Sequence, residues 1–223
     1  RERAHPQAGL AGKAMGNAFA RLVQTMRGAG ERPDLARFLV CIVFYQAGVQ
    51  TVVALAAVYA EQVMAFKTQE TITMVLIVNV AAAAGAFSFG ALQDRMGHVR
   101  TIAITLFGWI GTIVVAWFAL DKPTFWVAAT LAGICLGATQ AGGRALVGYL
   151  TPVGREGEYF GLWGMAMKLG QALGPATYGL VTLITAGNHR LAMIVTGVSF
   201  VIGLLILTSV DAERGRAAAE RSS

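Results

Sequence analysis

Polar side chains stand inside long apolar runs of this 223-residue chain, and several come in pairs with helical spacing. Gln46 and Gln50 are four residues apart, with Tyr45 and Thr51 beside them. A helix would place both glutamines on one face. Amide and hydroxyl groups in an apolar setting are costly unless they face a cavity or a partner. We therefore expect this face to offer hydrogen bonds to a small polar solute.

Two further pairs add positive charge to the apolar runs. Gln140 and Arg144 are four residues apart, and Lys168 lies three residues before Gln171. We expect Lys168, and with it Arg144, to attract a carboxylate, while the neighbouring glutamines hydrogen-bond it. Asn79 is a further candidate, alone in its run. The alternatives are that the arginine extends to lipid phosphates and that the amides tie helices together.

The elements that position these groups are about six apolar runs, each long enough to cross a bilayer as a helix. Backbone inside lipid must satisfy its own hydrogen bonds, and runs of this length are too long for barrel strands. The composition agrees, because the chain is 56% hydrophobic and 13% charged with a mean hydropathy of +0.59. The sequence predicts an all-α integral membrane protein with spans at 37–60, 70–92, 101–120, 124–148, 159–186 and 190–210.

A charged, glycine-flanked turn separates the second and third runs. Its glycines would allow close helix approach and a tight turn, its aspartate could accept hydrogen bonds from a helix N-terminus, and its arginines could bind phosphates or the aspartate. We predict a gating loop, the alternative being a plain basic turn. The residues concerned are Gly90, Asp94, Arg95, Gly97 and Arg100.

The distribution of the 18 Lys and Arg residues predicts the orientation of the chain. Most of them lie in the N-terminal segment, in the loops at 93–100 and 149–158, and in the C-terminal tail, whereas Lys67, Lys122 and Arg190 lie on the opposite side. The positive-inside rule then makes both termini cytoplasmic. It also explains the net charge of +6, so we expect no nucleic-acid partner.

The two ends of the chain differ from the apolar middle. Residues 1–36 read as a basic cytoplasmic linker, either loosely ordered or carrying an amphipathic helix on the membrane surface. Residues 211–223 are rich in Ala, Arg and Glu, which predicts a disordered cytoplasmic tail. Since the chain begins with Arg1 rather than methionine, we expect it to be part of a longer protein.

Glycine is abundant in the apolar runs, with 27 in the chain. Gly133 and Gly137, like Gly170 and Gly174, are four residues apart and predict close helix packing. Gly174 and Pro175 together predict a kink in the fifth span. Cys41 and Cys135 lie inside apolar runs and suggest neither a disulfide nor a metal site. Without a recognisable catalytic or cofactor motif, we predict neither an enzyme nor a bound cofactor or metal.

Several segments together resemble one family of transporters. They are Gly48-Val49-Gln50-Thr51-Val52, Gly137-Ala138-Thr139-Gln140-Ala141 with Arg144, Pro152, Glu158-Tyr159-Phe160-Gly161, Lys168 and Gly174-Pro175. With the charged turn, they resemble the C-terminal half of the vacuolar amino-acid effluxer-like (autophagy-related) family in the major facilitator superfamily. Gln93 and His98 depart from the small and basic residues usual in that turn, and Gln46-Ala47 replaces an Asn-Asp pair frequent in the family.

The resemblance implies six transmembrane helices arranged as two three-helix repeats, forming half of a secondary transporter that works by alternating access. Spans one and four would line the path, spans two and five would gate it, and spans three and six would face lipid. Amino acids are the expected solutes, and the partner is an N-terminal six-span half or a second copy of the chain. We expect a bacterial inner membrane as the location. The alternative is a non-transporting membrane subunit that serves assembly or anchoring.

Overall fold

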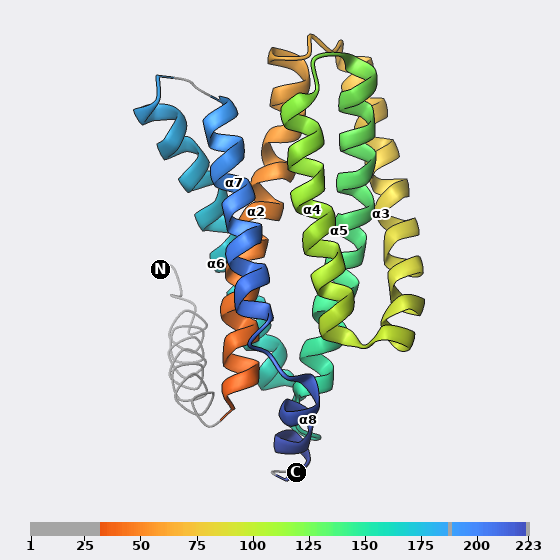
Figure 1. Cartoon of the computed structure of the whole chain (residues 1–223), viewed down its shortest axis with the longest axis vertical. Helices are drawn as coiled ribbons and strands as arrows, with labels where there is room; N and C mark the ends of the chain where they lie inside the picture. The colour runs from red at the N-terminus through yellow and green to blue at the C-terminus, as the bar shows by residue number, and fades with distance from the viewer. Residues whose placement is uncertain (1–31, 187–188, 222–223) are drawn as a thin grey trace, which may run out of the picture.

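The computed structural model describes residues 32–186 and 189–221, which form helices and no strands (Figure 1). Six long helices run roughly along the vertical axis of Figure 1, and a short one lies at their lower end. Their bounds are α2 Pro33–Gln62, α3 Thr68–Met96, α4 His98–Phe118, α5 Lys122–Leu150, α6 Glu156–Ile184, α7 His189–Leu207 and α8 Ala212–Glu220.

Local sequence signals set the ends of these helices. A proline lies in the first turn of both α2 and α5, where its missing N–H costs nothing. Asp121 caps α5 by accepting a hydrogen bond of 3.4 Å from the Thr124 N–H. Gly97 ends α3 with φ +85°, a conformation that glycine adopts without strain. Each long helix therefore begins in the polar flank before its predicted apolar run, and α2, α3 and α5 also extend past the end of theirs.

Four of the helices, α2 to α5, are long and apolar enough to cross a membrane. A fifth span is counted if Leu191–Leu207 and α8, which are bent by 59° at a short break, are taken together. Helix α6 has 29 residues but carries Lys168 and Gln171 in its middle and does not meet the same criterion. The chain is thus a multi-pass integral membrane protein, with four to five spans by length and composition.

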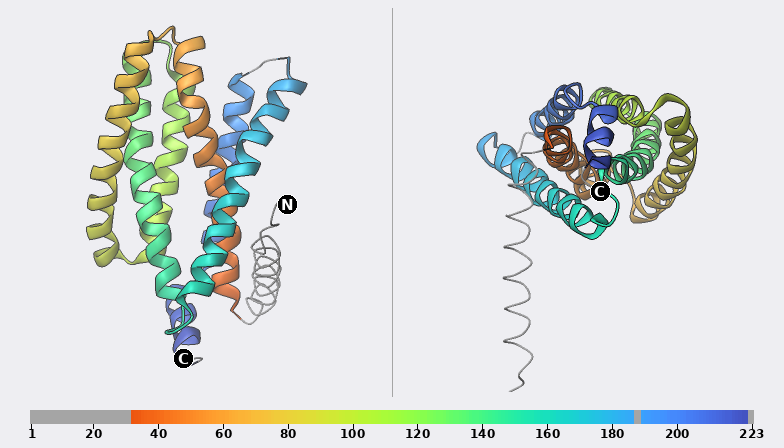
Figure 2. Two further views of the ribbon diagram at one scale, coloured as in Figure 1. Left: turned by 180° about the vertical axis from the view of Figure 1, so that it is seen from behind. Right: turned by 90° about the horizontal axis from the view of Figure 1, so that it is seen from below.

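The long helices pack in a reciprocal pattern. Helix α2 packs against α6 and α7, while α5 packs against α3 and α4, and α4 also contacts α7. The end-on view in Figure 2 shows these helices gathered into one bundle. Residues far apart in the chain, such as those of α2 and α7, therefore lie side by side.

Glycines allow the closest of these contacts, as predicted from their spacing. A Cβ added to Gly133 on α5 would lie 2.5 Å from the Val78 carbonyl oxygen on α3, and one on Gly137 would overlap the Ala82 carbonyl. The α2–α6 contact is equally tight, because a Cβ on Gly170 would lie 2.8 Å from the Val43 carbonyl oxygen. These positions admit no larger side chain without moving the facing helix.

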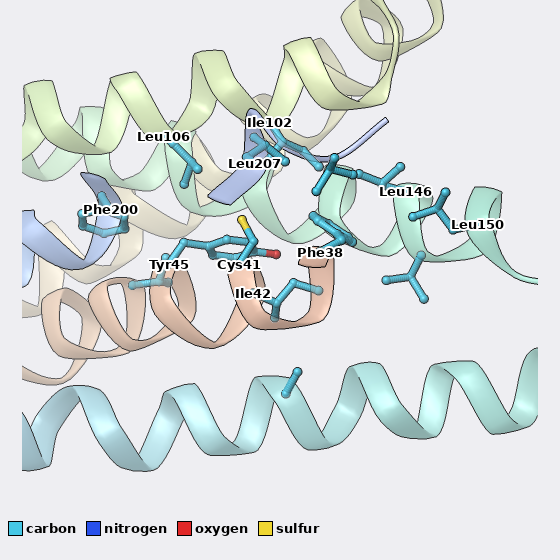
Figure 3. Packing of buried hydrophobic residues seen from close by; sticks show 14 of the residues in the cluster. Phe38, Cys41, Ile42, Tyr45, Ile102, Leu106, Leu146, Leu150, Phe200 and Leu207 are labelled. Atoms are coloured by element: carbon cyan, nitrogen blue, oxygen red, sulfur yellow. The ribbon is translucent and has the colours of Figure 1, made fainter. Parts of the chain in front are cut away.

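Two apolar clusters fill the bundle. The larger joins α2, α4, α5, α6 and α7 and is shown in part in Figure 3, where Tyr45 and Cys41 of α2 lie among side chains of α4 and α7. The Trp109 and Phe200 rings stack within it with centroids 5.1 Å apart. The smaller cluster lies near the turns that join α2 to α3 and α4 to α5, and includes Tyr59 and Phe125.

The C-terminal segment is a helix, so the predicted disorder from Asp211 onward is wrong for Ala212–Glu220. Asp211 caps α8 through a hydrogen bond of 3.0 Å from the Arg214 N–H. The helix packs on α5 and α2 and buries Ala219. Small residues of α8 approach the bundle closely, and Arg214 pairs with Asp34. Composition alone does not reveal either contact.

The N-terminal prediction is only partly within the described residues. The proposed amphipathic helix falls in residues 1–31, outside the part that the structure describes. The expected boundary at 36 lies inside α2, since this helix already begins at Pro33. The proline and Asp34 in the first turn account for the earlier start.

Candidate functional site

A cavity of about 240 Å³ lies between the two apolar clusters, in the half of the bundle nearer the α2–α3 and α4–α5 turns. All six long helices contribute to its wall. Its volume is below the roughly 300–1,000 Å³ typical of pockets for drug-sized ligands, so it suits a small solute. The partly exposed Ala57 and the exposed Asn79 lie on the wall, so the cavity reaches the protein surface.

The threonine hydroxyls and the asparagine amide on the cavity wall are already hydrogen-bonded within their own helices. The Thr51 hydroxyl donates to the Ala47 carbonyl at 2.8 Å, and Asn79 Nδ2 donates to the Val75 carbonyl at 2.8 Å. Thr112 and Thr196 do the same toward the residue four before each. Among the described residues that line the cavity there is no charged side chain. The wall is therefore mainly apolar, with oxygen lone pairs left to accept hydrogen bonds.

Aromatic rings hold the cavity open at both ends. Trp109 is fixed at one end, because its Nε1 donates a hydrogen bond of 2.9 Å to Thr139 Oγ1 on α5. Tyr59 and Phe125 stack at the other end with centroids 5.5 Å apart. Beyond them, Lys122 Nζ donates a hydrogen bond of 2.7 Å to Glu70 Oε2 and ties the start of α5 to the start of α3. These contacts fix the cavity wall near the α2–α3 and α4–α5 turns, which the sequence predicts to lie on the side of the membrane opposite the termini.

The predicted residues of the first span separate in the structure. Thr51 lies on the cavity wall together with Asn79. Tyr45 is buried in the larger apolar cluster, with its hydroxyl against Gly143. Gln46 is fully buried against α6, and neither of its amide atoms has a hydrogen-bond partner among the described residues. Gln50, one turn further on, is half-buried and outside the cavity wall.

The charged candidates lie outside the cavity. The Arg144 guanidinium is exposed and sits over the Trp163 ring, 5.5 Å from its centroid. Lys168 is also exposed, and its Nζ donates to Gln171 Oε1 at 3.1 Å, so this predicted pair is in contact. Gln140 is half-buried one turn before Arg144. Among the described residues, Lys168 and Gln171 are thus in contact, and the predicted pairs are not joined into one site.

The charged turn has a different construction from the one predicted. No heavy atom of a neighbouring element in the described part of the chain lies within 4 Å of a Cβ built on Gly90, so this glycine makes no close helix contact there. Asp94 makes no side-chain cap on α4. Gly97 does form the turn, with φ +85°, and Arg95 and Arg100 are exposed on either side of it.

Two residues that depart from the usual motif make the contacts of this turn. Gln93 is buried, and its Nε2 lies 2.6 Å from His98 Nδ1 and 3.3 Å from the Gly142 carbonyl oxygen on α5. The turn is therefore joined to α5 through an amide, rather than through the aspartate.

Helix α6 continues through Pro175 as one helix from Glu156 to Ile184. The proline removes the hydrogen bond that its N–H would give to the Gln171 carbonyl, which makes this the weakest point of the α6 backbone. Gly174 packs here against the Ala47 carbonyl of α2. The predicted bending point is thus also a contact point between two helices.

Comparison with known proteins gives the family. The family described as "Vacuole effluxer Atg22 like" matches residues 1–220. The chain belongs to this family. A relative in Bacillus subtilis, named "Uncharacterized MFS-type transporter YxiO", is 26% identical over 197 residues, covering 88% of this chain and 46% of its own length.

Fungal proteins of the Atg22 type are similar to the same degree. "Autophagy-related protein 22" of Candida glabrata is 26% identical over 201 residues, covering 85% of this chain and 37% of the fungal protein. The Saccharomyces cerevisiae protein of that name is 24% identical over 213 residues, covering 91% and 40%. The chain thus spans less than half the length of these relatives.

Sequence reasoning missed most of the cavity wall. It singled out polar residues, whereas the wall is built mainly from aromatic rings, alanines and larger aliphatic side chains. Alanines of α2 and α5 leave the space, and the rings of four residues bound it. These are Tyr59, Trp109, Phe125 and Tyr178. A sequence signal was present for two of them, because Tyr59 and Phe125 border alanine-rich stretches of α2 and α5.

Proposed function

We propose that this chain is the C-terminal half of a secondary transporter that moves small polar solutes, amino acids being the expected class, by alternating access. The observation that carries the proposal is the cavity between the helices of an Atg22-like, multi-pass membrane chain. The named relatives include an MFS-type transporter, which favours transport over anchoring. The rival reading is a non-transporting membrane subunit.

The helix packing supports two three-helix repeats, α2–α4 and α5–α7. Exchanging each helix with its counterpart in the other repeat turns the α2–α6 contact into the α5–α3 contact and the α2–α7 contact into the α5–α4 contact. The α4–α7 contact maps onto itself. Internal repeats related in this way are typical of secondary transporters, which rock one unit against another around a site near the bilayer centre.

Six spans require that α6 and α7 also cross the membrane. Helix α6 is as long as α3 and α5, and its low apolarity comes partly from Lys168 and Gln171. A polar residue within a span is tolerated where it faces a water-filled path or protein. We therefore assign the exposed face of α6 to the solute path, toward an N-terminal half or a second copy of the chain.

The carboxylate of an amino acid would be held at the charged candidates rather than inside the cavity. Lys168 and Arg144 offer exposed cations on neighbouring helices α6 and α5, whereas the cavity wall offers mainly apolar surface. The cavity would hold the solute at a separate stage of the path, near Thr51 and Asn79, because Tyr178 on its wall lies about 15 Å along α6 from Lys168. Gln50 and Gln140 would then hydrogen-bond the polar end, as their half-buried positions allow.

The test is solute flux in liposomes that contain the full-length protein. We expect labelled amino acids to move down their gradient with wild-type protein. Ala57→Phe, which adds a ring at the cavity wall, should abolish this flux, whereas Ala84→Phe at an exposed position of α3 outside the cavity should preserve it. Flux that is absent from well-folded wild-type protein with any amino acid, or unaffected by Ala57→Phe, would count against the proposal.

A further inference from the structure

A single side-chain amide joins three helices at the end of the bundle where α3 turns into α4. Gln93 is 5% exposed, and its Nε2 lies 2.6 Å from His98 Nδ1 on α4. The same nitrogen donates to the Gly142 carbonyl oxygen on α5 at 3.3 Å. An amide NH₂ has two hydrogens, so both contacts are hydrogen bonds only when His98 Nδ1 is an acceptor, which requires a neutral ring.

We propose that His98 is a proton-binding site whose protonation releases this link between α3 and α5. When the ring gains a proton, both of its nitrogens become donors, and Nδ1–H then faces the N–H of Gln93. Rotating the amide would offer Oε1 to His98 but would turn the same oxygen toward the Gly142 carbonyl, with no hydrogen between the two oxygens. Either arrangement loses one of the contacts in a buried setting, where an unpaired polar group is costly.

Groups from three other elements face the histidine. Partial burial lowers the pKa of the His98 ring, although the Asp94 carboxylate of α3 and the Glu213 carboxylate of α8 attract a proton to it. The Tyr149 ring of α5 lies 4.7 Å from the His98 ring, and its hydroxyl donates to Glu213 Oε1 at 3.4 Å. The Arg216 guanidinium of α8 lies over the same Tyr149 ring, 5.4 Å from its centroid.

His98 would gain its proton within the physiological pH range, because imidazole is the side chain that ordinarily titrates between about pH 5 and 8. The link lies at one end of the α3–α5 contact, whose middle is fixed by Gly133 and Gly137 against the α3 backbone. Releasing it frees the end of α3 while the middle stays packed. The inference concerns the conformation of the helices and does not depend on which solute the protein carries.

The experiment measures the α3–α5 distance in the full-length protein in lipid nanodiscs by double electron–electron resonance. Spin labels at Ala91→Cys and Ala145→Cys occupy exposed positions on the two helices. Cys41 and Cys135 are buried and should not react, which a sample without added cysteines checks, and exposed cysteines elsewhere in the protein are replaced. Spectra are recorded from about pH 5 to 8.

We expect the mean distance to shift to longer values as the pH falls, with a single midpoint in this range. His98→Asn keeps an acceptor oxygen near the position of Nδ1 and should hold the short distance at every pH. Gln93→Leu removes the link and should give the longer, pH-independent distance. A wild-type distance that does not change with pH, or a His98→Asn distance that changes as the wild type does, would overturn the proposal.

Discussion

The Arg214 guanidinium of α8 binds the carboxylate of Asp34 in the first turn of α2, 180 residues earlier in the chain. Arg214 Nε donates to Asp34 Oδ2 at 2.6 Å, and a second hydrogen bond joins Nη2 to Oδ1. The Asp211 N–H adds a third at 3.0 Å. Asp34 is 2% exposed, so this carboxylate depends on these donors. The first and last described helices are therefore joined at one end of the bundle.

Substituting Arg214→Gln should loosen α8 without unfolding the bundle. The variant removes the charged donor to Asp34, so we expect hydrogen–deuterium exchange across Ala212–Glu220 to become roughly tenfold faster, as for loss of a hydrogen bond to a charged group. The control is Glu220→Gln, which breaks only a contact within α8. Equal exchange rates in wild type and Arg214→Gln would show that the pair does not hold α8.

Two glycine-to-alanine substitutions should differ in their effect on the free energy of unfolding. Gly137→Ala places a methyl group onto the Ala82 carbonyl, so we expect the free energy of unfolding to fall by about 1–3 kcal/mol. Gly179→Ala, with no neighbouring atom within 4 Å, should be neutral or gain up to about 1 kcal/mol from helix propensity. Thermal unfolding of the purified full-length protein measures both. Equal melting temperatures for the two variants would contradict a tight α3–α5 contact at Gly137.

Gln46→Leu should fold at least as well as the wild type. Its amide is buried without a partner among the described residues, so an apolar side chain of similar size removes a desolvation cost of about 1–3 kcal/mol. Thermal unfolding should show an unchanged or higher melting temperature. A clear loss of stability would mean that the amide has a hydrogen-bond partner such as a bound water.

Lys168→Gln should raise the KM for flux several-fold, because it removes the cation that we assign to the solute carboxylate. Lys168→Arg keeps the charge and should retain most of the activity. Lys67→Gln, at the exposed start of α3, serves as a matched control with the same loss of charge. Unchanged flux by a well-folded Lys168→Gln variant would contradict the assignment.

Local patterns in the sequence predicted the helices well. Apolar length placed all six long helices within a few residues of their observed bounds, and the i, i+4 glycines identified both tight helix contacts. Contacts between residues far apart in the chain could not be predicted from these local patterns. Helix α8 depends on Asp34 at the other end of the described chain, and the cavity wall is assembled from all six long helices.

The charged turn illustrates the same limit. Its glycine, aspartate and arginines were predicted from their types and spacing, and Gly97 ends α3 with φ +85°. The contact to α5 is made by Gln93, whose partner Gly142 is 49 residues away. No local pattern indicates that pairing, because it depends on how α3 packs on α5.

The most direct test of the account is chemical access to the cavity in the presence and absence of solute. Ala57→Cys in the full-length protein places a thiol on the cavity wall, and its rate of modification by a membrane-impermeant reagent is measured with and without a mixture of the twenty amino acids. Val153→Cys, exposed in the α5–α6 turn, is the control. The account predicts that the mixture slows modification at 57 but not at 153. A thiol at 57 that reacts at the same rate with and without amino acids would contradict a solute path through this cavity.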